Sequence, residues 1–148
     1  YKMYYPMLRV SQHMASFGRA KTLRLAPKGF LRRNHAWLNG REVPKDVKAK
    51  LANRLLHLEA TRLGDWKRPL VDTLTGHCQG LFEIRTAKAR IQYRILGCHG
   101  PGTRTPTLLY GFIKRGDKVP DKDCDEALAR KARVETNTIG HRVQHDYS

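Results

Sequence analysis

The sequence predicts an α+β fold in which an N-terminal strand and a helical hairpin pack on a three- to four-stranded antiparallel sheet, followed by a short C-terminal helix. Three observations support this order. Apolar residues recur at helical spacing between residues 30 and 63, three short segments rich in β-branched and aromatic residues follow, and an acidic-to-basic gradient begins at Asp121. The 148 residues fit one domain, and no apolar run approaches the ~18–20 residues of a membrane span.

The N-terminal half contains the expected strand and hairpin. Residues 1–20 form an unassigned extension, and residues 21–25 alternate polar and apolar side chains, as in a short strand with Leu23 and Leu25 facing inward. A short helix is expected over residues 30–39 and a longer one over residues 44–63. The buried stripe of the longer helix consists of Val47, Leu51, Leu55 and Leu58. About four residues join the two helices, which predicts an antiparallel pair.

The centre of the chain predicts a three-stranded meander. The strands are expected at residues 81–85, 90–96 and 107–113, and the turn signal Gly100-Pro101-Gly102 precedes the third. In the middle strand, one face carries Ile91, Tyr93 and Ile95, and the other carries Arg90, Gln92 and Arg94. We expect the apolar face to pack on the helices and the second face to form a basic surface.

The C-terminal part predicts one helix and a tail. Asp121 is a good N-cap, acidic residues occupy the first turn, and basic residues occupy the last turns, so both ends suit the helix dipole. The apolar face of this helix is weak. Residues 135–148 are polar, contain His141 and His145 and show no pattern, so we expect a flexible tail.

The charge indicates a polyanionic partner. The chain has 29 Lys and Arg against 13 Asp and Glu, a formal net charge of +16. Nucleic acid is the commonest partner of a compact domain this basic. Binding to a membrane surface is the rival, but no segment combines a bulky apolar face with a basic one. A basic domain without a polyanionic partner is the plain alternative.

The cysteines predict neither a disulfide framework nor a metal site. Cys78, Cys98 and Cys124 are odd in number and lack C-x-x-C spacing, and no signal peptide is recognised, so we expect a cytoplasmic protein. The pairs His77-Cys78 and Cys98-His99 contain zinc-ligand types. The usual ligand spacings are absent, however, and we expect no metal or other cofactor.

Several short stretches, taken in order, resemble a known family. They are Trp37-Leu38, residues 70–76, residues 80–85, residues 93–96, residues 111–115, Val119-Pro120 and the helix containing Ala127-Leu128-Ala129. Residues 31–134 thereby resemble the RelE/HigB-like toxins of bacterial type II toxin–antitoxin pairs, especially their phage-derived subgroup. The resemblance implies a RelE-like fold over residues 21–134. It also implies a cytoplasmic ribonuclease that cuts messenger RNA in the ribosomal A site and is covered by a cognate helix-turn-helix antitoxin.

The cations on the predicted strands suit that chemistry. Cutting RNA without a metal requires attack of the 2′-OH on the adjacent phosphate, and fixed cations stabilise the charge that develops there. Arg85, Arg94 and Lys114 lie on or near three strands of one sheet and are the predicted catalytic cations. Further RNA contacts are expected from Lys88, Arg90, Arg115 and Lys118. Each cation has an ordinary alternative, such as a solvent-facing Arg94, an Arg85 paired with Glu83, or charges that protect a sheet edge.

The proton-transfer group is less well defined. Several members of the family use a Tyr or His near the start of the last helix or in the tail, where this chain has Val119, Pro120 and Asp121. We take His99 as the leading candidate because the histidine pKa lies near neutrality. His77, His141 and His145 are the other candidates. Each could equally be an ordinary turn or surface histidine.

Three functions therefore compete. The leading hypothesis is a metal-independent mRNA endoribonuclease that acts on ribosome-bound message. The missing aromatic residue before the last helix favours a non-catalytic phage regulator that binds RNA or the ribosome. A ParE-like inhibitor of DNA gyrase shares the fold, and fold alone does not fix function.

Overall fold

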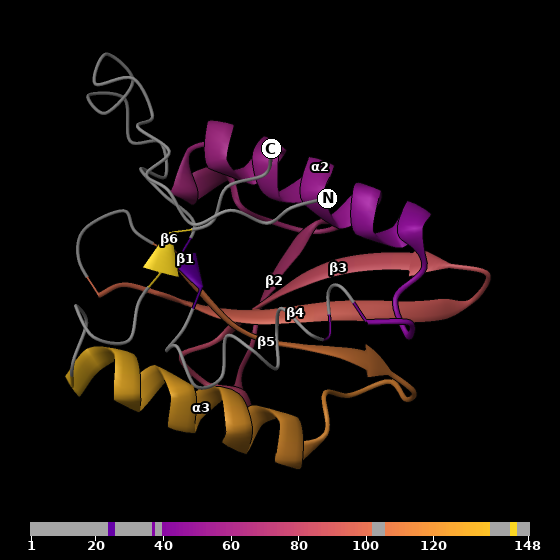
Figure 1. Ribbon diagram of the computed structural model, residues 1–148. Helices are drawn as coiled ribbons and strands as arrows, with labels where there is room; N and C mark the ends of the chain where they lie inside the picture. The colour runs from indigo at the N-terminus through magenta and orange to yellow at the C-terminus, as the bar shows by residue number, and fades with distance from the viewer. Residues whose placement is uncertain (1–23, 26–36, 38–39, 102–105, 137–142, 145–148) are drawn as a thin grey trace.

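A computed structural model describes residues 24–25, 37, 40–101, 106–136 and 143–144. These residues form an α+β fold, as predicted, with one sheet between two helices (Figure 1). The elements are β1 Arg24–Leu25, α2 Lys45–Ala60, β2 Val71–Thr73, β3 Phe82–Lys88, β4 Ile91–His99, β5 Pro106–Lys114, α3 Asp121–Thr136 and β6 Val143–Gln144. The helix expected over residues 30–39 lies outside the described residues except for Trp37.

The sheet has the strand order β2-β3-β4-β5-β1-β6. Strands β2 to β5 form an antiparallel meander, which confirms the three predicted strands and adds β2 at the edge. The sequence analysis did not assign β2, because three residues are too few to show an alternating pattern. Strand β1 pairs with β5 in parallel, and β6 pairs with β1 in antiparallel orientation.

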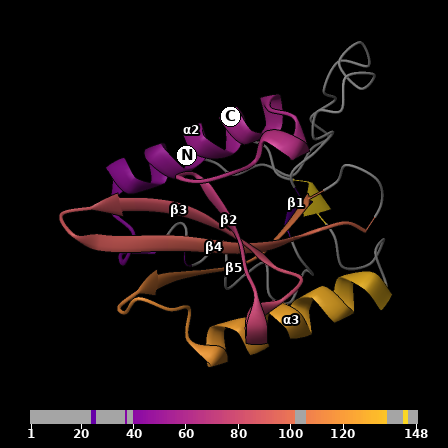
Figure 2. The ribbon, with the colours of Figure 1, turned by 180° about the vertical axis from the view of Figure 1, so that it is seen from behind.

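Helix α2 covers one face of the sheet, and α3 covers the other (Figures 1 and 2). The predicted stripe of α2 is buried against Ile84, Tyr93 and Leu108 of the sheet. The helix ends at Ala60, before the predicted residue 63. Thr61 adopts an extended conformation while its N–H donates to the carbonyl of Leu58. The chain then turns so that the indole N–H of Trp66 also donates to Leu58 O, at 3.0 Å.

The two faces of β4 only partly match the prediction. Tyr93 and Ile95 are buried on the α2 side, as expected, but Ile91 is 45% exposed because it directly follows the turn between β3 and β4. The opposite face is not the basic surface that was predicted. Leu96 packs in the apolar core beneath α3. Arg94 is buried as well, and the carboxylate of Glu83 on β3 balances its charge.

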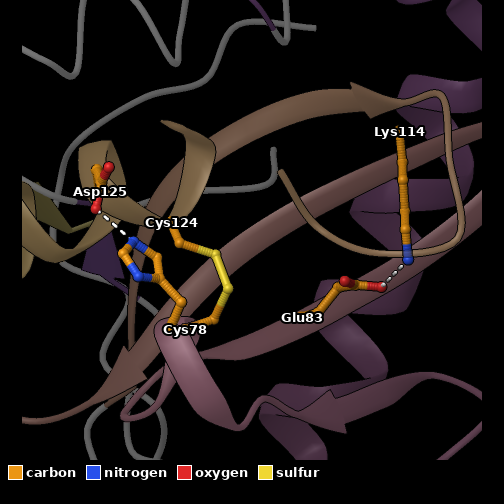
Figure 3. The surroundings of a disulfide bond; sticks show 6 residues. Cys78, Glu83, Lys114, Cys124 and Asp125 are labelled. Atoms are coloured by element: carbon orange, nitrogen blue, oxygen red, sulfur yellow. Dashed lines mark hydrogen bonds and ion pairs between the residues drawn. A yellow bond between two sulfur atoms is a disulfide. The ribbon is translucent and has the colours of Figure 1, made fainter. Parts of the chain in front are cut away.

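A disulfide joins Cys78 to Cys124, contrary to the sequence prediction (Figure 3). Cys78 ends the short 3-10 helix Gly76–Cys78, and Cys124 lies in the first turn of α3. The two cysteines are 46 residues apart in sequence, so only the packing of this turn against α3 brings them together. Cys98 is buried outside the disulfide.

The C-terminal region differs from the prediction at two places. Helix α3 runs to Thr136, into the segment expected to be the tail. Arg130, one of its basic residues, is buried and donates to the carbonyl of Leu109 at 2.7 Å. Val143 and Gln144 form β6 within the segment expected to be a patternless tail, which corrects that prediction at these two residues. Among the described helices, none is both long and apolar enough to cross a membrane.

Candidate functional site

Three cationic side chains from three adjacent strands converge on one buried carboxylate, Glu83. Its Oε1 atom lies 2.7 Å from Nε of Arg94, 3.0 Å from Nε of Arg85 and 4.0 Å from Nζ of Lys114. The register explains this meeting, because Arg85 lies opposite Arg94 across the β3–β4 pair and side chains two residues apart on a strand share a face. The structure therefore brings together the three cations that the sequence analysis selected.

Arg94 is held by the protein from several sides. Its Nη1 donates to the carbonyls of Thr86 and Tyr93, each at 3.0 Å, and its Nη2 donates to the amide oxygen of Gln92. Burial lowers the pKa of the guanidinium, and the carboxylate of Glu83 counteracts this effect. Arg94 is thus fully engaged within the sheet, where it helps to fix the position of Glu83.

Asp72 on β2 extends this arrangement toward the surface. Its Oδ2 lies 2.6 Å from Nη2 of Arg85 and 2.8 Å from Nη2 of Arg68. The hydrogen bond from Arg68 is the main reason that the pKa of Asp72 lies below its usual value, and the charges of Arg85 and Lys114 act in the same direction. The network contains four cations and two carboxylates and therefore carries a net charge of +2. We call these six residues the Glu83 network.

A cleft of about 530 Å³ lies over the Glu83 network. Its floor includes Glu83, Arg85 and Lys114, and Asp72 and Arg68 lie along one side. The segment from Thr73 to Cys78 forms a wall, and the loop after β5 with the start of α3 closes the cleft through Asp117, Lys118, Val119 and Asp121. Figure 3 shows Lys114 reaching down to Glu83 and the disulfide at the wall. On the floor, Arg85 and Lys114 outnumber Glu83, so an anionic group that reaches the floor meets positive charge there, whereas Asp117 and Asp121 place negative charge on the opposite wall.

The histidines separate into different environments. His77 lines the cleft, and its Nε2 lies 2.7 Å from Oδ1 of Asp125; this hydrogen bond, together with the charge of Asp121, raises the pKa of His77. His99, the leading sequence candidate, packs instead against the rings of Phe82 and Trp66. Burial there lowers the pKa of His99. The structure does not place His99 among the residues that line the cleft, and His141 and His145 lie outside the described residues.

The four cations expected to bind RNA fall into two groups. Lys88 pairs with Asp46 at 2.7 Å, and Arg90 occupies the turn between β3 and β4 with a positive φ of 68°, so both lie at the hairpin end. Arg115 and Lys118 are exposed on the loop after β5. Lys118 lines the cleft, whereas Arg115 lines a neighbouring pocket of about 820 Å³. Only Lys118 of the four adds to the charge of the cleft itself.

Sequence reasoning missed the two carboxylates that organise the site. Glu83 was noted only as a partner for Arg85, and Asp72 only as part of a resembling stretch. The spacing of Glu83 and Arg85 at i and i+2 on one strand was the available signal, because it places both side chains on one face. In the described part of the chain, no group of three or more His, Cys, Asp or Glu side chains is arranged to hold a metal ion.

Comparison with known proteins gives one match. A family model described as "Phage derived protein Gp49-like (DUF891)" matches residues 37–132. This range covers α2, strands β2 to β5 and most of α3, and so includes every residue of the Glu83 network. Searches of curated proteins and of solved structures found no significant match.

Proposed function

The chain belongs to the Gp49-like family of phage-derived proteins, and we propose that it is the toxin of a type II toxin–antitoxin pair that cuts messenger RNA without a metal ion. The single observation that carries this proposal is the net positive charge of the Glu83 network beneath an open cleft. The family match supports the toxin role, and the chemistry of the cleft supports the choice of RNA as its substrate.

The expected reaction is attack of the ribose 2′-OH on the adjacent phosphorus. The bond from phosphorus to the 5′-oxygen breaks, the 2′-OH gives up its proton to water and the 5′-oxygen takes a proton from water, which leaves a 2′,3′-cyclic phosphate and a 5′-hydroxyl. Negative charge grows on the phosphate oxygens during this step, and cations that are already fixed in place stabilise it at no cost of reorganisation. The Glu83 network is such an arrangement, because its cations are held by carboxylates on rigid strands.

The exposure of each cationic side chain decides whether it can contact a phosphate directly. The side chain of Arg85 is 28% exposed, and Lys118 is exposed at the rim, so these two are the proposed direct phosphate contacts. Arg85 offers a guanidinium, which can bind phosphate through two parallel hydrogen bonds. Arg94 and Lys114 are largely buried and act by their charge and by fixing Glu83.

The proposed protein partner is a small helix-turn-helix antitoxin with an acidic segment. A net charge of +16 attracts such a segment over long range, and an anionic side chain in the cleft would exclude the RNA phosphate from the same place. The ribosome, itself rich in phosphate, is the proposed location of the messenger RNA substrate. An antitoxin gene next to this one is therefore expected.

The test compares the rate of RNA cleavage by the wild type with the rates of two variants, one in the cleft and one outside it. Purified protein is added to ribosomes that are translating a defined message, and cleavage is mapped by primer extension. We expect Arg85→Ala to lower the rate by about 10²-fold or more, since the loss of one such donor costs about 10²–10³-fold. Lys45→Ala, an exposed lysine at the start of α2, should cut at the wild-type rate. Intact message at high protein concentration would contradict the proposal.

A non-catalytic RNA-binding regulator is the second candidate, and one observation favours it. Arg85 is paired with both Asp72 and Glu83, so a phosphate must compete with two carboxylates for this side chain. If the chain is such a regulator, it should bind RNA with strong salt dependence and leave the RNA intact. A supercoiling assay in parallel tests the gyrase-inhibitor alternative, which predicts relaxed DNA and uncut RNA.

A further inference from the structure

The cleft wall is tied to α3 by two neighbouring contacts. Cys78 is bonded to Cys124, and the preceding residue, His77, forms its ion pair with the following residue, Asp125 (Figure 3). Two consecutive residues of the wall are therefore matched with two consecutive residues of the first turn and a half of α3. The same helix begins at Asp121, which lines the other side of the cleft. The disulfide thus connects two walls of one cleft.

We propose that the Cys78–Cys124 disulfide is a thiol-controlled clamp that holds the cleft in its RNA-binding shape, so that reduction of the disulfide weakens RNA binding and cleavage. This inference rests on the proposed function and adds a means of regulating it. The clamp is a positioning device, because neither sulfur has to touch the RNA.

The wall has few other ties among the contacts of the described residues. Its backbone bonds stay within its own turn or reach the residue before β3: Gln79 N donates to Gly76 O at 3.1 Å, Leu81 N to Cys78 O at 3.2 Å and Leu74 N to Leu81 O at 3.0 Å. The 3-10 helix itself has only three residues. The side chains of His77 and Asp125 are 50% and 64% exposed, and an ion pair this open to water contributes little. Apolar packing of Leu74 with Ala127 and Leu128 is a further contact with α3, and the disulfide is the covalent connection between this wall and the helix.

The bond can be reached from the cleft. Cys78 lines the cleft with 8% of its surface exposed, whereas Cys124 is fully buried, so a reductant small enough to enter the cleft meets Cys78 first. A dithiol reductant attacks Cys78 as a thiolate, Cys124 leaves as a thiolate, and the second thiol of the reductant displaces Cys78. Two electrons and two protons pass to the two cysteines, and the reductant becomes a disulfide. Disulfides that a reductant can reach are reduced more readily than fully buried ones.

His77 provides a reporter of the clamp that does not depend on RNA. Its pKa is raised by its contact with Asp125, and that contact requires the wall to stay on α3. The other charged groups around this cleft are Asp121 of α3, Asp117 and Lys118 of the preceding loop, Lys114 of β5, Glu83 and Arg85 of β3, and Asp72 and Arg68 beside β2. Asp121 also raises the pKa of His77 and belongs to α3, so its effect should weaken together with that of Asp125 when the wall leaves the helix.

The experiment compares the oxidised full-length protein with the same protein reduced by dithiothreitol. The binding of a labelled single-stranded RNA is measured by fluorescence anisotropy, and the pKa of His77 is measured by NMR, with His77→Gln to assign its signal. The double variant Cys78→Ser/Cys124→Ser should behave as the reduced form under all conditions. Cys98→Ala, which leaves the disulfide intact, should respond to dithiothreitol as the wild type does.

We expect reduction to weaken RNA binding and to slow cleavage by about tenfold to 10²-fold, the range that follows from a displacement of about 1 Å in a positioning element. The pKa of His77 should fall toward the ordinary histidine value at the same time. Far-UV circular dichroism establishes that both forms are folded at the assay temperature. Folded forms that bind RNA equally, or an unchanged pKa of His77, would overturn the clamp. If neither form binds RNA, the proposed function fails, and the pKa of His77 alone decides whether the clamp exists.

Discussion

Glu83 is the residue on which the position of the cationic side chains depends. Arg85, Arg94 and Lys114 all approach its Oε1 atom, while Oε2 is buried and makes no hydrogen bond with the described residues. Such a group does not stabilise a protein by being an ion pair alone, because taking charges out of water is costly. Its role is to keep several cations at fixed positions beneath the cleft.

Replacement of Glu83 by Gln should therefore destabilise the fold strongly. The change leaves Arg94 and Lys114 buried without their counter-charge, and breaking such a pair typically costs about 3–5 kcal/mol. Urea denaturation of Glu83→Gln beside the exposed control Glu42→Gln measures the difference. A free energy of unfolding within 1 kcal/mol of the control, on the same order-of-magnitude scale, would show that the network is not structurally important.

His77 should make stability depend on pH near neutrality. Because its pKa in the folded protein is raised above the ordinary value of 6.5, its contribution is fully present below pH 6.5 and is lost as the pH rises through the folded pKa. As the pH rises from 6.5 through the raised folded-state pKa of His77, the free energy of unfolding of the wild type should therefore fall more than that of His77→Gln. Parallel curves for the two proteins would mean that the contact with Asp125 is not formed in solution.

At the scale of elements, the close packing of β4 between β3 and β5 requires glycine at position 97. The register of β4 with β5 shifts between Leu96 and Gly97, and a bulge of this kind re-aims the side chains that follow it. A Cβ atom on Gly97 would lie 2.8 Å from the carbonyl oxygen of Thr107 and closer still to the ring of Phe82. Backbone on one side and a buried ring on the other leave no room for it.

Gly97→Ala should for this reason lower the free energy of unfolding by about 1–3 kcal/mol, the usual cost of overpacking a core. Gly64→Ala is the matched control, because a Cβ there meets nothing within 4 Å. Thermal denaturation of the two variants beside the wild type provides the comparison. Equal midpoints for both glycine variants would mean that β4 and β5 can move apart at little cost.

At the scale of the whole molecule, the disulfide closes a long loop. Cys78 and Cys124 are separated by 46 residues, and restricting the unfolded chain over a loop of that length is worth roughly 4 kcal/mol. Cys78→Ser/Cys124→Ser should lose about that much stability in urea denaturation, while Cys98→Ala keeps the loop closed. A double variant as stable as the wild type would indicate that the unfolded chain is already compact in this region.

The excess of positive charge should appear in the salt dependence of RNA binding. For single-stranded RNA the slope of log K against log salt is about −0.7 per phosphate contacted, so Lys118→Ala should reduce the slope by about 0.7. Lys45→Ala should leave the slope unchanged, since that lysine lies away from the cleft at the start of α2. Equal slopes for the two variants would place the bound RNA somewhere other than the cleft.

The sequence by itself determined the class of fold, the buried stripe of α2, the three central strands and the choice of Arg85, Arg94 and Lys114 as a group. The fold class, the stripe and the strands depend on local periodicity, which survives in any single sequence. The choice of the three cations depended in addition on the family resemblance, and their role stays a prediction. The expectation of a basic surface on β4 failed because periodicity assigns a face but not what covers it. Glu83 and α3 supply that cover.

Only the tertiary structure decided which groups share the cleft. It placed His77 there and His99 against aromatic rings, it joined two cysteines 46 residues apart, and it added Asp72 to the cations from a three-residue strand. Contacts between residues distant in sequence leave no periodic trace, because each depends on how whole elements pack. The charge of the cleft, and with it the proposed chemistry, is therefore a property of the folded chain.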